Sequence, residues 1–191
     1  IMSVVIHEVS HGYAASMLGD ETARYEGRLT LNPAKHLDPF GSVIVPTMAY
    51  FLGGFIFGWA RPVPYNPYNL RPSRWSEALV AGAGPASNIL IALIFGLILR
   101  FGQESLSPAF ISITIIVVFI NIILAVFNMM PIPPLDGSKI LYAIFPAWGE
   151  KIRENLEKYG LLLVILFIFV AWSAILPIVL AIFGLITGIN L

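Results

Sequence analysis

Long apolar stretches separated by short polar ones dominate the chain. Three of them, residues 77–100, 110–128 and 161–187, are each about as long as a helix must be to cross a bilayer. A fourth, residues 1–18, is barely long enough, and we expect its helix to begin upstream of the first residue. The pattern predicts an all-α polytopic membrane protein with about four transmembrane helices.

The stretch between the first two of these helices, residues 19–76, breaks this pattern. Its apolar run 40–59 has the length of a span, but proline and glycine residues interrupt it. We expect a short helix that ends near Phe51, followed by extended chain over 55–65. A short strand is also predicted at 23–31, where apolar and polar residues alternate loosely. This stretch is thus predicted to be a re-entrant helix and strand region that dips into the membrane and returns.

The composition agrees with a membrane protein organised as a single domain over 1–191. Hydrophobic residues make up 58% of the chain and charged residues 12%, with a mean hydropathy of +0.84. Soluble domains usually carry about twice that share of charge. The formal net charge of zero argues against nucleic acid as a partner. Because the chain has no cysteine, a metal site must use histidine and carboxylate ligands.

The first apolar stretch contains the pattern H-E-x-x-H, formed by His7, Glu8 and His11. Residues four apart lie on one face of a helix, so both imidazoles can reach one metal ion. Glu8 lies beside the first ligand, where a carboxylate can accept a proton from water. A catalytic zinc usually has three protein ligands, and His36 and Asp136 are the main candidates for the third. Asp136 is favoured because it follows a span directly, on a segment stiffened by prolines.

The choice of Asp136 predicts the topology of the chain. If Asp136 meets His7 and His11, the run 40–59 cannot cross the membrane and must return to the face it left. With that dip, every lysine and arginine except Arg100 lies on one side of the membrane. The positive-inside rule makes this side cytoplasmic. The predicted active site therefore opens toward the cytoplasm.

Three motifs together resemble the site-2 protease family of intramembrane zinc metalloproteases. They are H-E-x-x-H at 7–11, Gly-Pro-Ala-Ser-Asn at 84–88, and the proline-rich segment from Asn128 to Asp136 and Gly137. The motifs occur in the family's order, and the resemblance covers nearly the whole chain except the last apolar stretch. No PDZ domain is apparent in these residues, so the chain resembles the compact form of the family.

The resemblance implies the roles of six residues. One zinc ion would be bound by His7, His11 and Asp136, with Glu8 as the catalytic base. Asn88 and Asn128 would bind the substrate or stabilise the oxyanion. Asn121, which the resemblance does not include, is interpreted as an amide that packs between helices.

The sequence thus predicts an enzyme that hydrolyses peptide bonds within or near transmembrane segments. Its partners would be a transmembrane protein or peptide substrate and the lipid bilayer. Two alternatives are a metal transporter and a catalytically silent membrane scaffold. A transporter would not need Glu8, and a silent scaffold would lack at least one motif residue, whereas this chain retains all of them.

Overall fold

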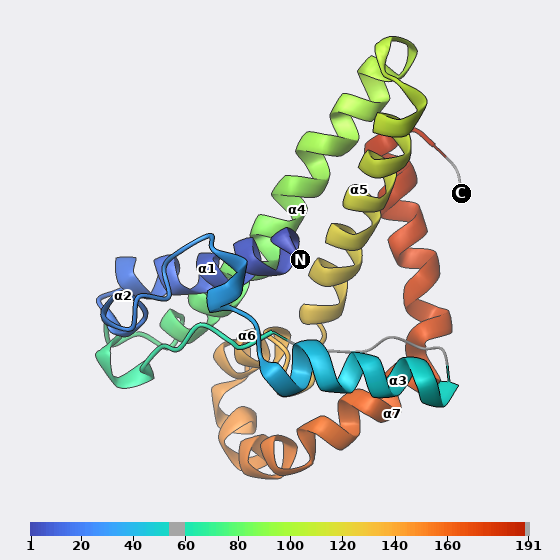
Figure 1. Ribbon diagram of the computed structural model, residues 1–191. Coiled ribbons are helices and arrows are strands. Elements are labelled where there is room, and N and C mark those ends of the chain that lie inside the picture. Colours follow the sequence, from blue (N-terminus) through green and yellow to red (C-terminus); the bar gives the residue numbers. More distant parts are fainter. Residues whose placement is uncertain (54–59, 190–191) are drawn as a thin grey trace.

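The computed structural model describes residues 1–53 and 60–189, and every regular element within these ranges is helical. The centre of the fold is an antiparallel pair, α4 (Ser76–Gly102) and α5 (Pro108–Asn128), joined through the short helix η4 (Gln103–Ser105). The last part of the long helix α7 (Pro146–Thr187) packs beside this pair (Figure 1). The predicted all-α class is confirmed.

Local sequence explains where the paired helices begin and end. The Ser107 hydroxyl accepts a hydrogen bond from the amide of Phe110, and Pro108 occupies the first helical position of α5. The same helix ends at Asn128, just before a segment that contains three prolines. The chain then turns back and starts α6 (Gly137–Ile144) with Asp136 at its N-cap.

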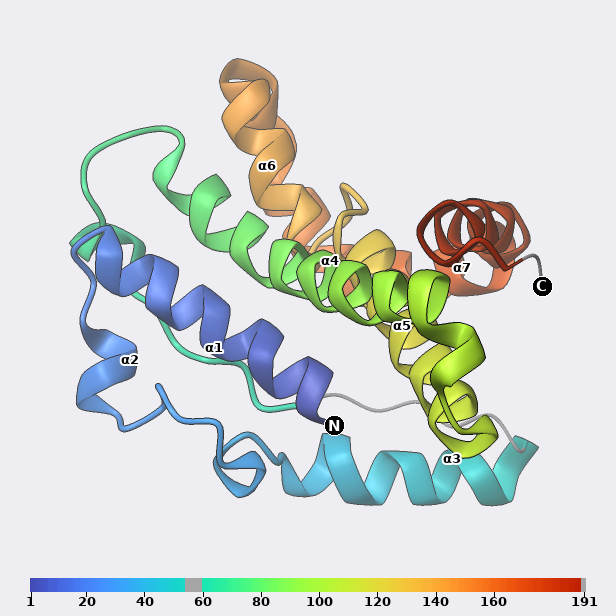
Figure 2. The ribbon, with the colours of Figure 1, turned by 90° about the horizontal axis from the view of Figure 1, so that it is seen from above.

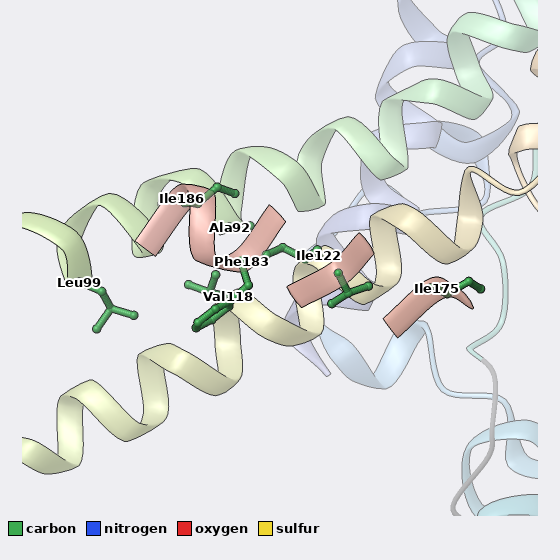
Figure 3. Packing of buried hydrophobic residues seen from close by; sticks show 8 residues of the cluster. Ala92, Leu99, Val118, Ile122, Ile175, Phe183 and Ile186 are labelled. Atoms are coloured by element: carbon green, nitrogen blue, oxygen red, sulfur yellow. The ribbon is translucent and has the colours of Figure 1, made fainter. Parts of the chain in front are cut away.

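A single apolar cluster holds α4, α5 and α7 together (Figure 3). Its buried members are Ala92 and Leu99 from α4, Val118 and Ile122 from α5, and Ile175, Val179, Phe183 and Ile186 from α7. These side chains come from one face of each helix, so the three helices share one interface.

Among the described residues, two helical stretches are long and apolar enough to cross a membrane, residues 76–105 and Pro108–Asn128. Within α7, Leu162–Ile168 and Ser173–Thr187 are bent by 70° and would together make a third span. The first helix, α1 (Met2–Met17), has only 16 residues. The predicted count of four spans is therefore not established by these lengths and stays a prediction.

The stretch between α1 and α4 differs in part from its prediction. The expected strand at 23–31 is wrong, because the chain forms the short helix α2 (Thr22–Tyr25) there and no strand among the described residues. A π-helix, η2 (Pro39–Ile44), leads into α3 (Val45–Gly53), which agrees with a short helix ending near Phe51. Residues 60–66 form no regular element, and the first part of the predicted extended stretch, 55–59, lies outside the described residues. Helix α3 lies at the end of the molecule opposite the α4–α5 turn (Figure 1).

Two further short helices complete this region, η1 (Pro33–Lys35) and η3 (Pro67–Asn69). The completely buried Asp20 ties the end of α1 to η3. Its carboxylate accepts hydrogen bonds from the Thr22 hydroxyl and amide, the Asn66 amide and the Asn69 side chain. Burial raises the pKa of Asp20, but these hydrogen bonds outweigh it and hold the pKa below its ordinary value.

Helix α4 positions the functional residues because both α1 and α6 pack against it (Figure 2). Helix α1 lies along one side of its first half, and α6 lies on the other. The two motif-bearing segments, which are more than 120 residues apart in the chain, are thereby brought onto the same stretch of α4.

Candidate metal centre

The imidazoles of His7 and His11 lie on the buried face of α1, where the two residues are 5% and 8% exposed. Their Nε2 atoms are 3.0 Å apart. Asp136, from the N-cap of α6, places Oδ2 at 3.2 Å from His7 Nε2 and at 3.4 Å from His11 Nε2. The structure therefore brings together the three side chains that the sequence analysis selected as metal ligands.

The hydrogen bonds of the two histidines determine which ring nitrogen carries the proton. His7 Nδ1 lies 2.6 Å from the Asn88 side-chain oxygen, and His11 Nδ1 lies 2.7 Å from the carbonyl oxygen of Val80. Both oxygens can only accept, so each Nδ1 must donate. With Nδ1 as the donor, the remaining ring nitrogen, Nε2, is the one that can bind a metal, and the two Nε2 atoms face the same place.

Asp136 supplies the third electron pair. Its Oδ2 atom is buried and has no hydrogen-bond partner among the described residues. Three lone pairs held this close repel one another unless a cation lies between them. The separations of 3.0–3.4 Å are near the ~3.3 Å edge of a tetrahedron with zinc–ligand bonds of about 2.0–2.1 Å. The donor set therefore fits a zinc ion with one coordination position left open.

The side chains of Asn88 and Asn121 form a hydrogen-bonded chain that ends on Nδ1 of His7. Asn88 donates from Nδ2 to the Ser3 carbonyl at 3.2 Å and to the Asn121 side-chain oxygen at 2.8 Å. Asn121 donates in turn to the Ser3 hydroxyl at 2.9 Å and to the Val117 carbonyl at 2.8 Å. Because the Ser3 carbonyl can only accept, the Asn88 amide can be oriented in only one way, with its oxygen toward His7. Asn121, interpreted from the sequence as a packing amide, belongs to this network.

Gly84 lies on the face of α4 that packs against the two histidine rings. A Cβ atom built there would lie in the space taken by the Nε2 atoms of His7 and His11. Gly82, two residues earlier, has open space at the corresponding position. Glycine at 84 therefore lets the two helices approach closely enough for both rings to share one site.

Glu8 and a small cavity complete the candidate site. The cavity has a volume of about 230 Å³ and is lined by the metal-ligand candidates together with Glu8, Val63, Tyr65, Asn128 and Lys139, among others. Oxygen Oε2 of Glu8 accepts a hydrogen bond from the Val63 amide at 2.9 Å. Burial, followed by the charges of Glu77 and Asp136, raises the pKa of Tyr65 to about 12, so its phenol stays protonated near neutral pH.

The remaining sequence candidates fall into two groups. Asn128 lines the cavity, and one hydrogen of its amide is used by the Leu124 carbonyl at 2.9 Å. His36, the alternative third ligand, is not part of the metal-ligand group. It is buried, and its Nε2 atom lies 2.8 Å from the carbonyl oxygen of Thr30.

The chain is similar to known proteins over most of its length. The family model described as Peptidase family M50 matches residues 97–172, which include Asn128 and Asp136. Three of its relatives are named "Putative zinc metalloprotease". YwhC of Bacillus subtilis is 41% identical over 170 residues, 84% of this chain and 73% of its own length. MJ0611 of Methanocaldococcus jannaschii is 46% identical over 141 residues, 72% of this chain and 63% of its own length.

The third relative, Rip2 of Mycolicibacterium smegmatis, is 28% identical over 165 residues, which make up 86% of this chain and 62% of that protein. No solved structure matches the chain. The chain thus spans about three quarters of YwhC and less than two thirds of the other two. Given its identity to YwhC over this share of both proteins, the chain belongs to peptidase family M50.

Proposed function

We propose that this protein is an intramembrane zinc metallopeptidase that hydrolyses peptide bonds within or near the transmembrane segments of its substrates. The observation that carries the proposal is the convergence of two Nε2 lone pairs and the unpartnered Asp136 oxygen beside the carboxylate of Glu8. The family membership and the names of the relatives support zinc as the metal.

His7, His11 and Asp136 would hold the zinc ion. When bound, zinc would supply a Lewis acid that makes water more acidic and the scissile carbonyl more electrophilic. Glu8 would accept one proton from the attacking water as its oxygen bonds to the carbonyl carbon. Glu8 would then return that proton to the nitrogen as the carbon–nitrogen bond breaks, which gives a carboxylic acid and an amine. The second water proton, on the new carboxylic acid, then passes to the amine, so the final products are a carboxylate and an ammonium group.

Two side chains of the cavity are suited to binding the peptide. Asn128 has a second amide hydrogen that no described partner takes up, and it can donate this hydrogen to a substrate carbonyl. Tyr65 presents a protonated phenol to the same cavity. Asn88 was also predicted to bind substrate, but its oxygen and both of its hydrogens already have partners. We therefore assign substrate binding to Asn128 and the support of His7 to Asn88.

The setting of the site supports the proposal of an intramembrane substrate. Two long apolar helices and the family membership indicate a membrane protein, and α4 connects its candidate span to the metal-ligand residues. A helical peptide bond is protected by its own hydrogen bonds, so the substrate must be extended at the cleavage point. The amides of Arg61 and Val63 are not available to pair with such an extended substrate. The His36 carbonyl accepts a hydrogen bond from the first, and the Glu8 carboxylate accepts one from the second.

We further propose the predicted topology, with residues 19–76 and 137–160 on the cytoplasmic side. The absence of native cysteine allows a direct test by single-cysteine labelling. Cysteine at Lys35 or Arg71 should react from the cytoplasmic side, and cysteine at Ser105 from the opposite side. Labelling of positions 35 and 71 from different faces would contradict this topology.

The function itself is tested by comparing Glu8→Gln with His7→Ala. Purified wild-type protein should contain about one zinc per chain and cleave a model transmembrane substrate. Glu8→Gln should keep the zinc but lose activity by at least about 100-fold, because it cannot accept the proton. His7→Ala should lose both metal and activity.

Other results would favour the alternatives. Zinc transport into vesicles that survives Glu8→Gln would indicate a transporter. Bound zinc without cleavage of any transmembrane substrate, by the wild-type protein, would indicate a silent scaffold.

A further inference from the structure

Arg28 is a buried charge that the proposed chemistry does not use. The residue is 5% exposed, and no carboxylate pairs with it among the described residues. Its Nη2 atom instead donates to two backbone carbonyls, Arg61 at 2.8 Å and Pro62 at 3.1 Å. Burial of a guanidinium without a carboxylate partner costs free energy, and the hydrogen bonds to these two carbonyls offset part of that cost.

The backbone of residues 61–64, which Arg28 contacts, is constrained by hydrogen bonds and by two prolines. The Arg61 amide donates to the His36 carbonyl at 2.8 Å, so both backbone groups of Arg61 are fixed. Pro62 and Pro64 restrict the backbone and provide no amide hydrogen. The Val63 amide is therefore the one donor between the two prolines.

Val63 packs against α1 beside Gly12. The residue is 5% exposed, and a Cβ built at Gly12 would lie 2.5 Å from Leu29 Cδ2 and 2.8 Å from Val63 Cγ1. Glycine at 12 thus leaves a hollow in α1 that Leu29 and Val63 occupy together. From this position the Val63 amide reaches Glu8 Oε2 at 2.9 Å.

We propose that Arg28 is a positioning residue for Glu8. Its two hydrogen bonds fix the carbonyls of Arg61 and Pro62, and this keeps the Val63 amide on one oxygen of the Glu8 carboxylate. The other oxygen, Oε1, has no described partner and is the one that exchanges the proton with water. The inference rests on the proposed function, in which Glu8 is the catalytic base.

The arrangement also explains why an arginine is needed. A planar guanidinium nitrogen carries two hydrogens at a fixed angle, which matches two successive carbonyls. A lysine is shorter and has no such fixed geometry, so Arg28→Lys should restore only part of the function of Arg28→Met. Because Arg28 touches neither the substrate nor the metal ligands, its loss should lower kcat and leave KM and zinc content nearly unchanged.

The test measures kcat, KM, zinc content and thermal unfolding for Arg28→Met, Val63→Pro and the double variant. Each single change should lower kcat by about 10–100-fold, the loss expected when a catalytic group is misplaced by about 1 Å. Zinc content should stay near one per chain, and KM should change by less than about threefold. The kcat of the double variant should be no lower than that of the less active single variant, because both changes break the same contact.

Two matched controls separate this effect from general damage. Arg61→Met removes a guanidinium from the held segment but leaves its backbone groups in place. Val63→Ala keeps the amide that Val63→Pro removes. Arg61→Met should retain kcat within about threefold of the wild type, whereas Val63→Ala, which leaves part of the hollow at Gly12 empty, should lose clearly less kcat than Val63→Pro.

Several outcomes would overturn the inference. They are wild-type kcat in Arg28→Met, loss of zinc in that variant, losses that multiply in the double variant, or equal losses in Val63→Pro and Val63→Ala. If Arg28→Met does not fold, Arg28→Lys replaces it in the same cycle. Glu8→Gln keeps the two proposals apart: an active Glu8→Gln refutes the proposed function, whereas an inactive one with a fully active Arg28→Met refutes only this inference.

Discussion

The candidate metal centre and the apolar core of α4, α5 and α7 both adjoin helix α4, but they are built in opposite ways. In the core, eight side chains pack by shape, and no polar atom has to meet another. In the candidate metal centre, atoms of distant segments must converge within a few tenths of an ångström, and each of the two histidines is held by a directed hydrogen bond. Packing contacts are individually weak and adaptable, whereas a ligand geometry fails when one partner moves.

The comparison predicts that small changes at the centre disturb function more than larger changes in the core. The largest effect is expected for Gly84→Ala. The added methyl group takes the space of the His7 and His11 Nε2 atoms, so zinc affinity should fall by more than about 100-fold. Competition with a chelator measures the affinity. Gly82→Ala, which has open space, is the matched control and should bind zinc normally.

A smaller effect is expected for Asn121→Leu. This change keeps the size of the side chain but removes the acceptor of the Asn88 amide, which in turn orients His7. Loss of such an outer partner typically weakens metal binding by about 10–100-fold. Ser112→Ala, which changes an exposed residue of the same helix, should leave zinc affinity unchanged. Normal affinity in Asn121→Leu would show that the network does not reach the metal.

The core provides the converse test. Phe183→Ala removes a fully buried ring from the cluster and should lower the free energy of unfolding by about 0.5–3 kcal/mol, the usual range for one substitution. Zinc affinity of the folded protein should change by less than about threefold. Denaturant titration and chelator competition on the same samples separate the two quantities. A loss of zinc affinity as large as that of Gly84→Ala would mean that the two regions are not independent.

The smallest effect concerns Asp20, which lies in neither region. Its pKa is lower in the folded protein than the ordinary value of about 3.9, so the carboxylate contributes stability above that pH. This contribution is lost as the pH falls through the lowered pKa. The melting temperature of the wild type should therefore exceed that of Asp20→Asn at pH 6, and the gap should narrow toward pH 3. A gap that is constant with pH would show that the charge of Asp20 contributes nothing.

The sequence by itself predicted the candidate site residues and the helical class. H-E-x-x-H places two imidazoles and a carboxylate close together on one helix because four residues make about one helical turn, a purely local rule. Long apolar runs likewise predict helices wherever they occur. The proline-rich segment marked Asp136 as a residue on broken backbone, and the structure places it with His7 and His11.

Only the tertiary structure decided how these residues are supported. Asn121 and Ser3 are unremarkable in the sequence, and they join the network because α1, α4 and α5 meet at that point. Arg28 is part of a predicted strand in the sequence, yet it is buried and holds carbonyls more than 30 residues away. Such contacts depend on which helices pack together and at what depth. Local patterns do not contain that information, because a hydrogen bond across the fold imposes no spacing along the chain.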